Sequence, residues 1–211
     1  MNRQILLGST YLGPVEYYAK IYAYSNVFIE GFDHYMKQTY RNRCTIASAN
    51  GPLSLTIPVE KGPADKVLMK DVRISDHGNW RHNHWNSFVA SYKQSPFFDY
   101  YSDEFHTFFE KKYDFLYDFN MELCQWVCAQ VDLGAQLVPT ADYIAEPSDM
   151  DDYRNAIHPK KNVADHDAHF YAKPYYQVFD QKQGFTPNLS IADLLFNMGP
   201  EALIVLRDCN K

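Results

Sequence analysis

The stretch QILLGSTYLGPVEYYAKIYAYSNVFIE, Gln4–Glu30, decides the fold class of this chain. It begins and ends with short apolar runs, Gln4–Leu7 and Val27–Glu30, that are typical of buried strands. Between them, Pro14 suits the first position of a helix, and Val15–Tyr24 carries apolar residues at helical spacing. A strand, a helix and a second strand in close succession predict a βαβ unit, in which the two strands pair in parallel.

A β-hairpin is expected soon after this unit. The segments Asn42–Ser48 and Leu53–Val59 favour strands, and the dipeptide Asn50–Gly51 between them is a strong hairpin signal. A polar loop is expected at Lys61–Lys66, and another strand at Lys70–Ser75, where apolar and polar residues alternate. The first third of the chain is therefore expected to be rich in β-structure.

Helical spacing dominates the rest of the chain. Helices are expected at Asn79–Tyr92, Pro96–Lys111, Tyr113–Val131, Ser190–Asn197 and Glu201–Leu206. Gly134 should end the third of them, and Ser190, with Asp193 three residues on, should cap the fourth. Val138–Thr140 is expected to be extended, and the polar segment Ala145–Phe170 to be a long loop or excursion.

These elements predict the α/β class. We expect an N-terminal mixed sheet with a βαβ start and a β-hairpin, followed by a mainly helical C-terminal half. A single domain spanning residues 1–211 is expected, with a sheet-rich part at 1–75 and a helix-rich part at 76–211 that contains the polar excursion near 145–170.

Composition narrows the functional classes. The net charge is −6 and the chain has no basic arm, which disfavours a large nucleic-acid-binding face. No segment approaches the ~20 apolar residues of a membrane span, and the first apolar run is too short for a signal peptide. We expect a cytoplasmic protein without a nucleic-acid partner, whose oligomeric state the sequence leaves open.

Metal binding is not expected. Cys124 and Cys128 are four residues apart in a helical pattern, and none of the four cysteines has the spacing of a zinc knuckle. Reduced thiols packed as small apolar groups explain them better. His166 and His169 stand among acids, but no sustained helical pattern supports them as a metal site. No cofactor can be named from these residues.

The loop after the first strand is one candidate site. Ligands of open α/β sheets bind at the carboxyl ends of the strands, where the N-terminus of the next helix can offer free N–H groups to an anion. Ser9, Thr10, Tyr11 and Tyr17 are the candidate binding residues here. The loop matches neither of the glycine-rich phosphate-binding motifs G-x-G-x-x-G and G-x-x-x-x-G-K-[ST], so a plain structural turn is the alternative.

The run KQTYRNR, Lys37–Arg43, is a second candidate. It places three cations, two amides and a tyrosine at the entry to a strand, which suits a phosphate group and a stacked ring. Arg41 and Arg43 should face opposite sides of an extended chain, so at most one of them points into a cleft. A solvated strand edge is the alternative.

The segment HGNWRHNHW, His77–Trp85, is the third candidate. Its histidines diverge around a helix, which disfavours a shared metal. We expect Asp76 or Asn79 to cap the helix and Trp85 to be buried, with Arg81 at the margin of the core and free to hold an anion. His84 is either an acid or base or a structural histidine.

The chain also resembles the WbqC-like protein family, which is associated with bacterial surface-polysaccharide gene clusters. The resemblance is collinear over nearly the whole chain. It rests on Tyr11–Pro14 with Tyr17, Tyr40–Arg43, Asn50–Pro52, Leu55–Val59, Asp71–Ile74, Trp80–Arg81, His84–Trp85 and Leu189–Gly199. Ser9–Thr10 departs from the Gln-Pro that is typical of the family before its first tyrosine. The resemblance implies a cytoplasmic bacterial protein of sugar or envelope metabolism.

Together these features predict a metal-independent transferase that binds an anionic small molecule, such as a sugar nucleotide. A cleft is expected between the N-terminal sheet and the helix that starts at Asn79. The candidate binding residues are Ser9, Thr10, Tyr11, Tyr17, Lys37, Tyr40, Asn42, Arg43, Trp80 and Arg81, and His84 is the candidate acid or base. The alternative is a non-catalytic binding or interaction protein that partners an envelope-assembly enzyme.

Overall fold

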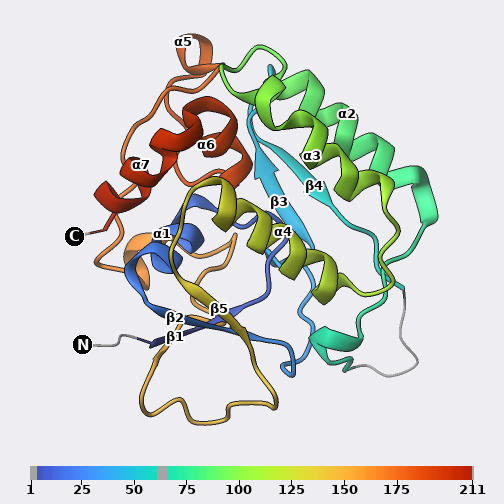
Figure 1. Ribbon diagram of the computed structural model, residues 1–211, viewed down its shortest axis with the longest axis vertical. Coiled ribbons are helices and arrows are strands. Elements are labelled where there is room, and N and C mark those ends of the chain that lie inside the picture. The colour runs from blue at the N-terminus through green and yellow to red at the C-terminus, as the bar shows by residue number, and fades with distance from the viewer. Residues whose placement is uncertain (1–3, 61–65, 211) are drawn as a thin grey trace.

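The computed structural model of the chain describes residues 4–60 and 66–210 (Figure 1). The polar loop expected at Lys61–Lys66 therefore lies almost entirely outside the described residues. The structure confirms the α/β class: a parallel sheet and a separate hairpin are followed by a mainly helical half. In Figure 1 the parallel sheet lies at the lower left, and the hairpin rises on the other side of helix α4 (Leu116–Gln130).

Four parallel strands form the main sheet, in the order β5-β2-β1-β6. These strands are β1 (Gln4–Gly8), β2 (Asn26–Glu30), β5 (Gln136–Pro139) and β6 (Asp151–Asp152). Helix α1 (Val15–Ala23) joins β1 to β2, which confirms the predicted βαβ unit. The side chains of Ile5, Leu6 and Leu7 on β1 are completely buried, as expected for a parallel strand that is covered on both faces.

The predicted hairpin is also confirmed, with shorter strands than expected. Strand β3 (Arg43–Ile46) pairs antiparallel with β4 (Leu53–Thr56). The turn is closed by reciprocal backbone hydrogen bonds of 3.1 Å between Ser48 and Gly51. Gly51 has a φ of 106°, a conformation that side chains disfavour, which explains why the Asn-Gly signal worked.

The strand expected at Lys70–Ser75 is wrong. Residues Met69–Asp71 form a 3₁₀ turn, and Arg73 and Ile74 make only isolated bridges, to Phe115 and Val59. Apolar and polar residues do alternate here, but among the described residues no strand pairs with the whole segment. Its backbone groups are satisfied one at a time by different partners, so a ladder does not form.

The regular structure of the second half is mainly helical. They are α2 (Trp80–Tyr92), α3 (Phe98–Glu110), α4, α5 (Asp180–Gln183), α6 (Ile191–Met198) and α7 (Ala202–Asp208). Helix α4 does not end at Gly134 as expected. Asp132 adopts the left-handed conformation with a φ of 57°, and the Leu133 amide donates to the Cys128 carbonyl at 2.8 Å, which closes the helix earlier.

The excursion after residue 145 is packed onto α1. Lys20 forms a nearly fully buried ion pair with Asp167, and Glu16 contacts the Nε2 atom of His166 at 2.7 Å. Lys20 also lies over the ring of Tyr153. Because Asp151–Asp152 adds the edge strand β6 to the sheet, the excursion is an integral part of the fold.

Candidate functional site

The carboxyl edge of the parallel sheet contains a small hollow at the point where the chain changes direction. From β1 the chain crosses to β2 on one side, whereas β6 pairs with β1 on the other side. In open α/β sheets this is where a crevice forms, because the loops after the two neighbouring strands diverge. The loops after β1 and β6 and the segment before β3 line the hollow, which we call the edge crevice: Gly8, Ser9, Thr10, Tyr17, Thr39, Tyr40, Arg41, Tyr153, Arg154 and Ile157.

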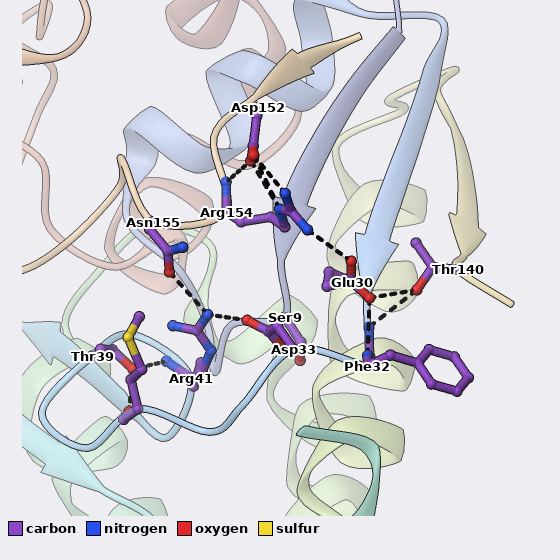
Figure 2. Close-up of polar contacts among 12 residues, drawn as sticks. Ser9, Glu30, Phe32, Asp33, Thr39, Arg41, Thr140, Asp152, Arg154 and Asn155 are labelled. Carbon is purple, nitrogen blue, oxygen red and sulfur yellow. Dashed lines mark hydrogen bonds and ion pairs between the residues drawn. The ribbon is translucent and has the colours of Figure 1, made fainter. Parts of the chain in front are cut away.

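Arg41 enters the edge crevice from the segment before β3 and is almost fully buried. Its Nη2 atom donates to Asp33 and, at 3.3 Å, to Oδ1 of Asn155 (Figure 2). Its backbone carbonyl accepts a hydrogen bond of 2.8 Å from Asn120, which also donates to Ser9 at 3.0 Å. The Nε atom of Arg41 is buried without a partner, so this guanidinium group retains an unused donor.

Arg154 enters from the loop after β6 and is also buried. Its guanidinium and backbone donate to Asp152, and Nη1 donates to Glu30 at 3.1 Å (Figure 2). Nη1 also donates to the carbonyl of Ile144 at 2.7 Å. Burial opposes ionisation of Asp152, but the hydrogen bonds from Arg154 prevail and lower its pKa. The acids thus hold the Arg154 side chain in place.

Glu30 anchors the centre of this network. Its carboxylate is fully buried at the end of β2 and accepts hydrogen bonds of 2.9 Å from the Phe32 amide and from the Thr140 hydroxyl. Thr140 follows β5, so Glu30 links the ends of three strands through Thr140 and Arg154. A buried carboxylate requires such partners, because an unpaired one would be strongly destabilising.

The rim of the edge crevice is basic. Partial burial lowers the pKa of His158, and the nearby cations Lys161, Lys160 and Arg41 lower it further. Lys160 contacts Gln38, and Lys161 donates to the carbonyl of Asn155 at 2.7 Å. Neither lysine has a carboxylate partner among the residues that the structure describes, so their charges remain available to an anion.

The predicted binding residues are distributed unequally around this site. Ser9, Thr10 and Tyr17, candidates of the first loop, line the edge crevice together with Tyr40, a candidate of the Lys37–Arg43 run. Lys37 is exposed on the adjoining loop. The side chain of Asn42 donates to the carbonyl of Ile57 at 2.8 Å and so fixes the chain beside the hairpin.

Arg41, and not Arg43, is the arginine of this run that lines the edge crevice. Arg43 lies on β3, where its Nε donates to the hydroxyl of Thr56 at 3.2 Å across the hairpin. The expectation for these two arginines assumed an extended chain, but Arg41 lies in a turn and only Arg43 lies in a strand. Only the pairing of β3 with β4 decides which of them faces the hairpin.

The N-terminus of α1 is not free to bind an anion, contrary to the expectation. The amide of Val15 donates to the carbonyl of Leu189, and that of Glu16 to the side chain of Asn188, both at 2.9 Å. The amide of Tyr17 is also used, by Pro14. These three amides are therefore occupied by the protein itself.

Tyr11 and His84 lie elsewhere, inside the core. The Tyr11 hydroxyl is 3.0 Å from Nδ1 of His84, and Tyr11 also stacks against Phe119. Burial lowers the pKa of His84 to about 4, although a hydrogen bond with the Thr56 backbone opposes this shift. His84 is therefore neutral near pH 7 with both ring nitrogens engaged, which favours the structural one of its two expected roles.

The two tryptophans of α2 exchange the positions expected for them, a buried Trp85 and a Trp80 that lines a binding site. Trp80 is buried against His84 and Phe119, whereas Trp85 is only half-buried. Asn79 precedes the helix in the left-handed conformation and makes no capping hydrogen bond. Asn79 is therefore not the predicted cap. Asp76 is not the cap either, because its carboxylate accepts hydrogen bonds from Arg81 and Lys112.

The single cleft expected between the sheet and α2 does not form. The rings of Tyr11, Trp80, His84 and Phe119 fill that space. The polar candidates are consequently split: four line the edge crevice, and Arg81 lines a different hollow near the start of α2.

Arg154, which lines the edge crevice, and two residues near it, His158 and Lys160, were missed at the level of sequence. All three belong to the excursion, which has no periodic pattern and so gave no indication of its position. One signal was present: Glu30 places a charge at the end of an otherwise apolar strand, and such a residue needs a cationic partner.

No group of three or more His, Cys, Asp or Glu side chains could hold a metal within residues 4–60 and 66–210. In the same parts of the chain, no helix is long and apolar enough to cross a membrane. The four cysteines are buried free thiols.

Comparison with known proteins shows the family of this chain. The WbqC-like protein family matches residues 9–205. The chain belongs to this family. It is similar to the uncharacterized protein Rv1507c of Mycobacterium tuberculosis, with 26% identity over 236 residues that cover all of both chains. No solved structure matches it. The matched range of this WbqC-like protein includes every residue that lines the edge crevice except Gly8.

Proposed function

We propose that this WbqC-like protein binds a phosphate-bearing small molecule, an activated sugar or a nucleotide, in the edge crevice. It acts there as a transferase of bacterial surface-polysaccharide metabolism in the cytoplasm. One observation carries the proposal: Arg41 and Arg154, far apart in sequence, are both buried at the switch point of the parallel sheet. The association of the WbqC-like family with surface-polysaccharide gene clusters supports the biological setting.

Charge supports an anionic ligand that reaches from the interior to the rim. Inside, the carboxylates of Glu30, Asp33 and Asp152 slightly outnumber the two guanidinium groups, so the interior alone does not attract an anion. Lys160 and Lys161 reverse this balance at the mouth. A phosphate group is therefore expected at the rim, where it contacts the lysines and the free edge of Arg41.

Two tyrosines are suited to the rest of the ligand. Tyr17 and Tyr40 line the edge crevice together. Burial raises the pKa of Tyr40 to about 12, and the nearby negative charge of Glu16 contributes to the shift. The Tyr40 hydroxyl therefore stays protonated and can donate to a sugar or base. Aromatic faces beside hydrogen-bonding groups are typical of sites that hold a sugar ring or a nucleobase.

Asp33 is the proposed base for the transfer step, in place of His84. Burial raises the pKa of Asp33, even though the adjacent Arg41 opposes the shift. Its Oδ1 atom is buried without a partner and can accept the proton of an acceptor hydroxyl. The remaining catalysis would come from positioning and from charge stabilisation by the arginines.

Access to the edge crevice requires the excursion to move. The hollow is only about 10 Å³, room for a single water-sized sphere. One wall consists of Tyr153, Arg154 and Ile157, all from the excursion. We expect this wall to shift when the ligand enters, while the loop after β1 stays fixed by its hydrogen bonds to Asn120 and Tyr40.

A thermal-shift screen tests the proposal. Purified protein is melted with nucleotides, sugar nucleotides and inorganic phosphate, with and without divalent metal, and positive compounds are titrated by calorimetry. A sugar nucleotide should raise the melting temperature without metal. Lys160→Gln combined with Lys161→Gln should weaken its binding by about tenfold, as expected for lost charge-assisted contacts.

The matched control is Arg43→Gln, which removes an arginine of the same run that lies outside the edge crevice. Equal losses in the Arg43 variant and the lysine variant would contradict the proposed site. Binding without any transfer to an acceptor would favour a non-catalytic binding protein instead.

A further inference from the structure

A second and larger hollow lies between the start of α2 and the end of α3. Its volume is about 390 Å³, within the range of small-molecule sites. We call it the α2–α3 hollow, and it is lined by Asp76, Asn79, Arg81, His82, Trp85, His106, Phe109, Glu110 and Lys112. It shares no lining residue with the edge crevice, so the function proposed above does not explain it.

One wall of the α2–α3 hollow is aromatic. The imidazole of His106 stacks on the indole of Trp85, with ring centroids 4.1 Å apart, and Phe109 lies beside them. Trp85 is half-buried: its indole packs against the core residues Phe98, Phe105 and Phe109, and its remaining surface lines the hollow. Such a wall provides an apolar surface for the C–H face of a ring.

The α2–α3 hollow is also lined by two cationic side chains, Arg81 and Lys112. The Arg81 guanidinium lies over the ring of Trp80, 4.8 Å from the centroid, and its side chain is only 15% exposed. Its Nη1 donates to Asp76, and Lys112 donates to the same carboxylate at 2.9 Å. Two cations share one carboxylate, and Nε of Arg81 has no acceptor, so this end keeps a positive charge and unused donors.

The remaining lining is polar. Asn79 makes no capping hydrogen bond, and the amide can therefore turn to a ligand. The carboxylate of Glu110 is exposed, and its Oε1 atom lies 3.9 Å from Nδ1 of His106. A flat apolar molecule would leave these groups without partners, whereas a ring with several hydroxyls would satisfy them.

We propose that the α2–α3 hollow binds an acidic sugar unit, a pyranose ring that carries a carboxylate. The carboxylate contacts Arg81 and Lys112, the ring lies against the wall formed by Trp85 and His106, and the hydroxyls contact Asn79 and Glu110. This site does not depend on the proposed function of the edge crevice. Acidic sugars are common units of charged polysaccharides, so the two sites are chemically compatible.

The test is a fluorescence titration of the full chain with sodium glucuronate, with glucose and lactate as separate arms. Glucuronate should change the tryptophan emission in a saturable way. Glucose, which lacks the carboxylate, and lactate, which lacks the pyranose ring, should each bind at least several-fold more weakly. Trp85→Phe should abolish the signal, and Trp126→Phe, the matched control outside the hollow, should keep it.

The cation pair is tested with Lys112→Gln and its neighbour Lys111→Gln, which pairs with Glu122 away from the hollow. Only the Lys112 variant should lose affinity for glucuronate. Arg81→Gln should lose about tenfold, provided that its circular dichroism matches the wild type. No saturable response to glucuronate, equal losses at Lys111 and Lys112, or loss of binding in the Lys160→Gln, Lys161→Gln variant would overturn the proposal.

Discussion

Tyr92 on α2 donates a hydrogen bond of 2.9 Å to Asp193 on α6, and both side chains are completely buried. Asp193 also accepts from Tyr175 at 2.7 Å and from Gln177 at 2.9 Å. Ser190 caps α6 as predicted, but Asp193 does not complete a capping box with it. The carboxylate instead ties two helices and the segment before α5 together inside the aromatic core.

The first prediction concerns this carboxylate and pH. Burial raises the pKa of Asp193 to about 6, although the hydrogen bonds from Tyr175, Tyr92 and Gln177 oppose the shift. A raised folded-state pKa means that the group contributes stability below its unfolded pKa of about 3.9, and that this contribution is lost as the pH rises through about 6. Urea unfolding from pH 4 to pH 7.5 measures it.

Asp193→Asn should remove that pH dependence, because the amide does not titrate. The variant should also be less stable at pH 7 by roughly 1–3 kcal/mol, since one of the three donors loses its acceptor. Asp99→Asn, at an exposed ion pair with Lys93, is the control and should change neither property. The assignment fails if wild type and Asp193→Asn keep parallel pH profiles.

The second prediction separates the tryptophans of α2. Trp80→Ala should lower the free energy of unfolding by about 3–5 kcal/mol, because it leaves a cavity in the core. Trp85→Ala should be clearly less destabilising, since Trp85 is half-buried at the wall of a hollow. Chemical denaturation of both variants measures the difference, and a larger loss at Trp85 would contradict the packing described here.

The third prediction concerns Tyr11 and His84. Tyr11→Phe leaves Nδ1 of His84 buried without a partner, and it should lower stability by roughly 1–3 kcal/mol. His84→Leu combined with Tyr11→Phe should lose less than the sum of the two single changes, because they remove one shared interaction. A double-mutant cycle in urea measures this, and strict additivity would argue that the pair is not coupled.

The fourth prediction concerns the buried ion pair that holds the excursion to α1. Asp167→Asn leaves the Lys20 ammonium buried without a countercharge, so stability should fall by about 3–5 kcal/mol. Hydrogen exchange should show faster exchange around Tyr153–Asp167 before the core opens. Asp165→Asn, at an exposed neighbouring acid, is the matched control. If protection from hydrogen exchange were lost uniformly over the whole chain, the excursion would not unfold as a unit of its own.

The outline of the fold was readable from local patterns. The βαβ unit at Gln4–Glu30 and the hairpin around Asn50–Gly51 were predicted because apolar runs, helical spacing and turn residues depend on short stretches of chain. The strand predicted at Lys70–Ser75 failed for the opposite reason. A strand also needs a partner along its length, and alternation alone does not provide one.

The candidate site was predicted only in part, for the same physical reason. Ser9, Thr10 and Tyr17 were named because they follow the first strand, and Tyr40 because it belongs to the cationic run before the hairpin; all four line the edge crevice. Arg154 was not, because the excursion has no local pattern and its position depends on pairing with β1.

Local sequence thus determined the βαβ unit, the hairpin and the main helices of this WbqC-like protein, since backbone propensities and turn chemistry act over a few residues. The tertiary structure decided which charges meet. Arg41 faces the edge crevice and Arg43 the hairpin, Trp80 enters the core and Trp85 the hollow, and Glu30 finds Arg154 across 124 positions of chain. These choices depend on long-range packing and on the need to pair every buried charge, neither of which a short stretch of sequence contains.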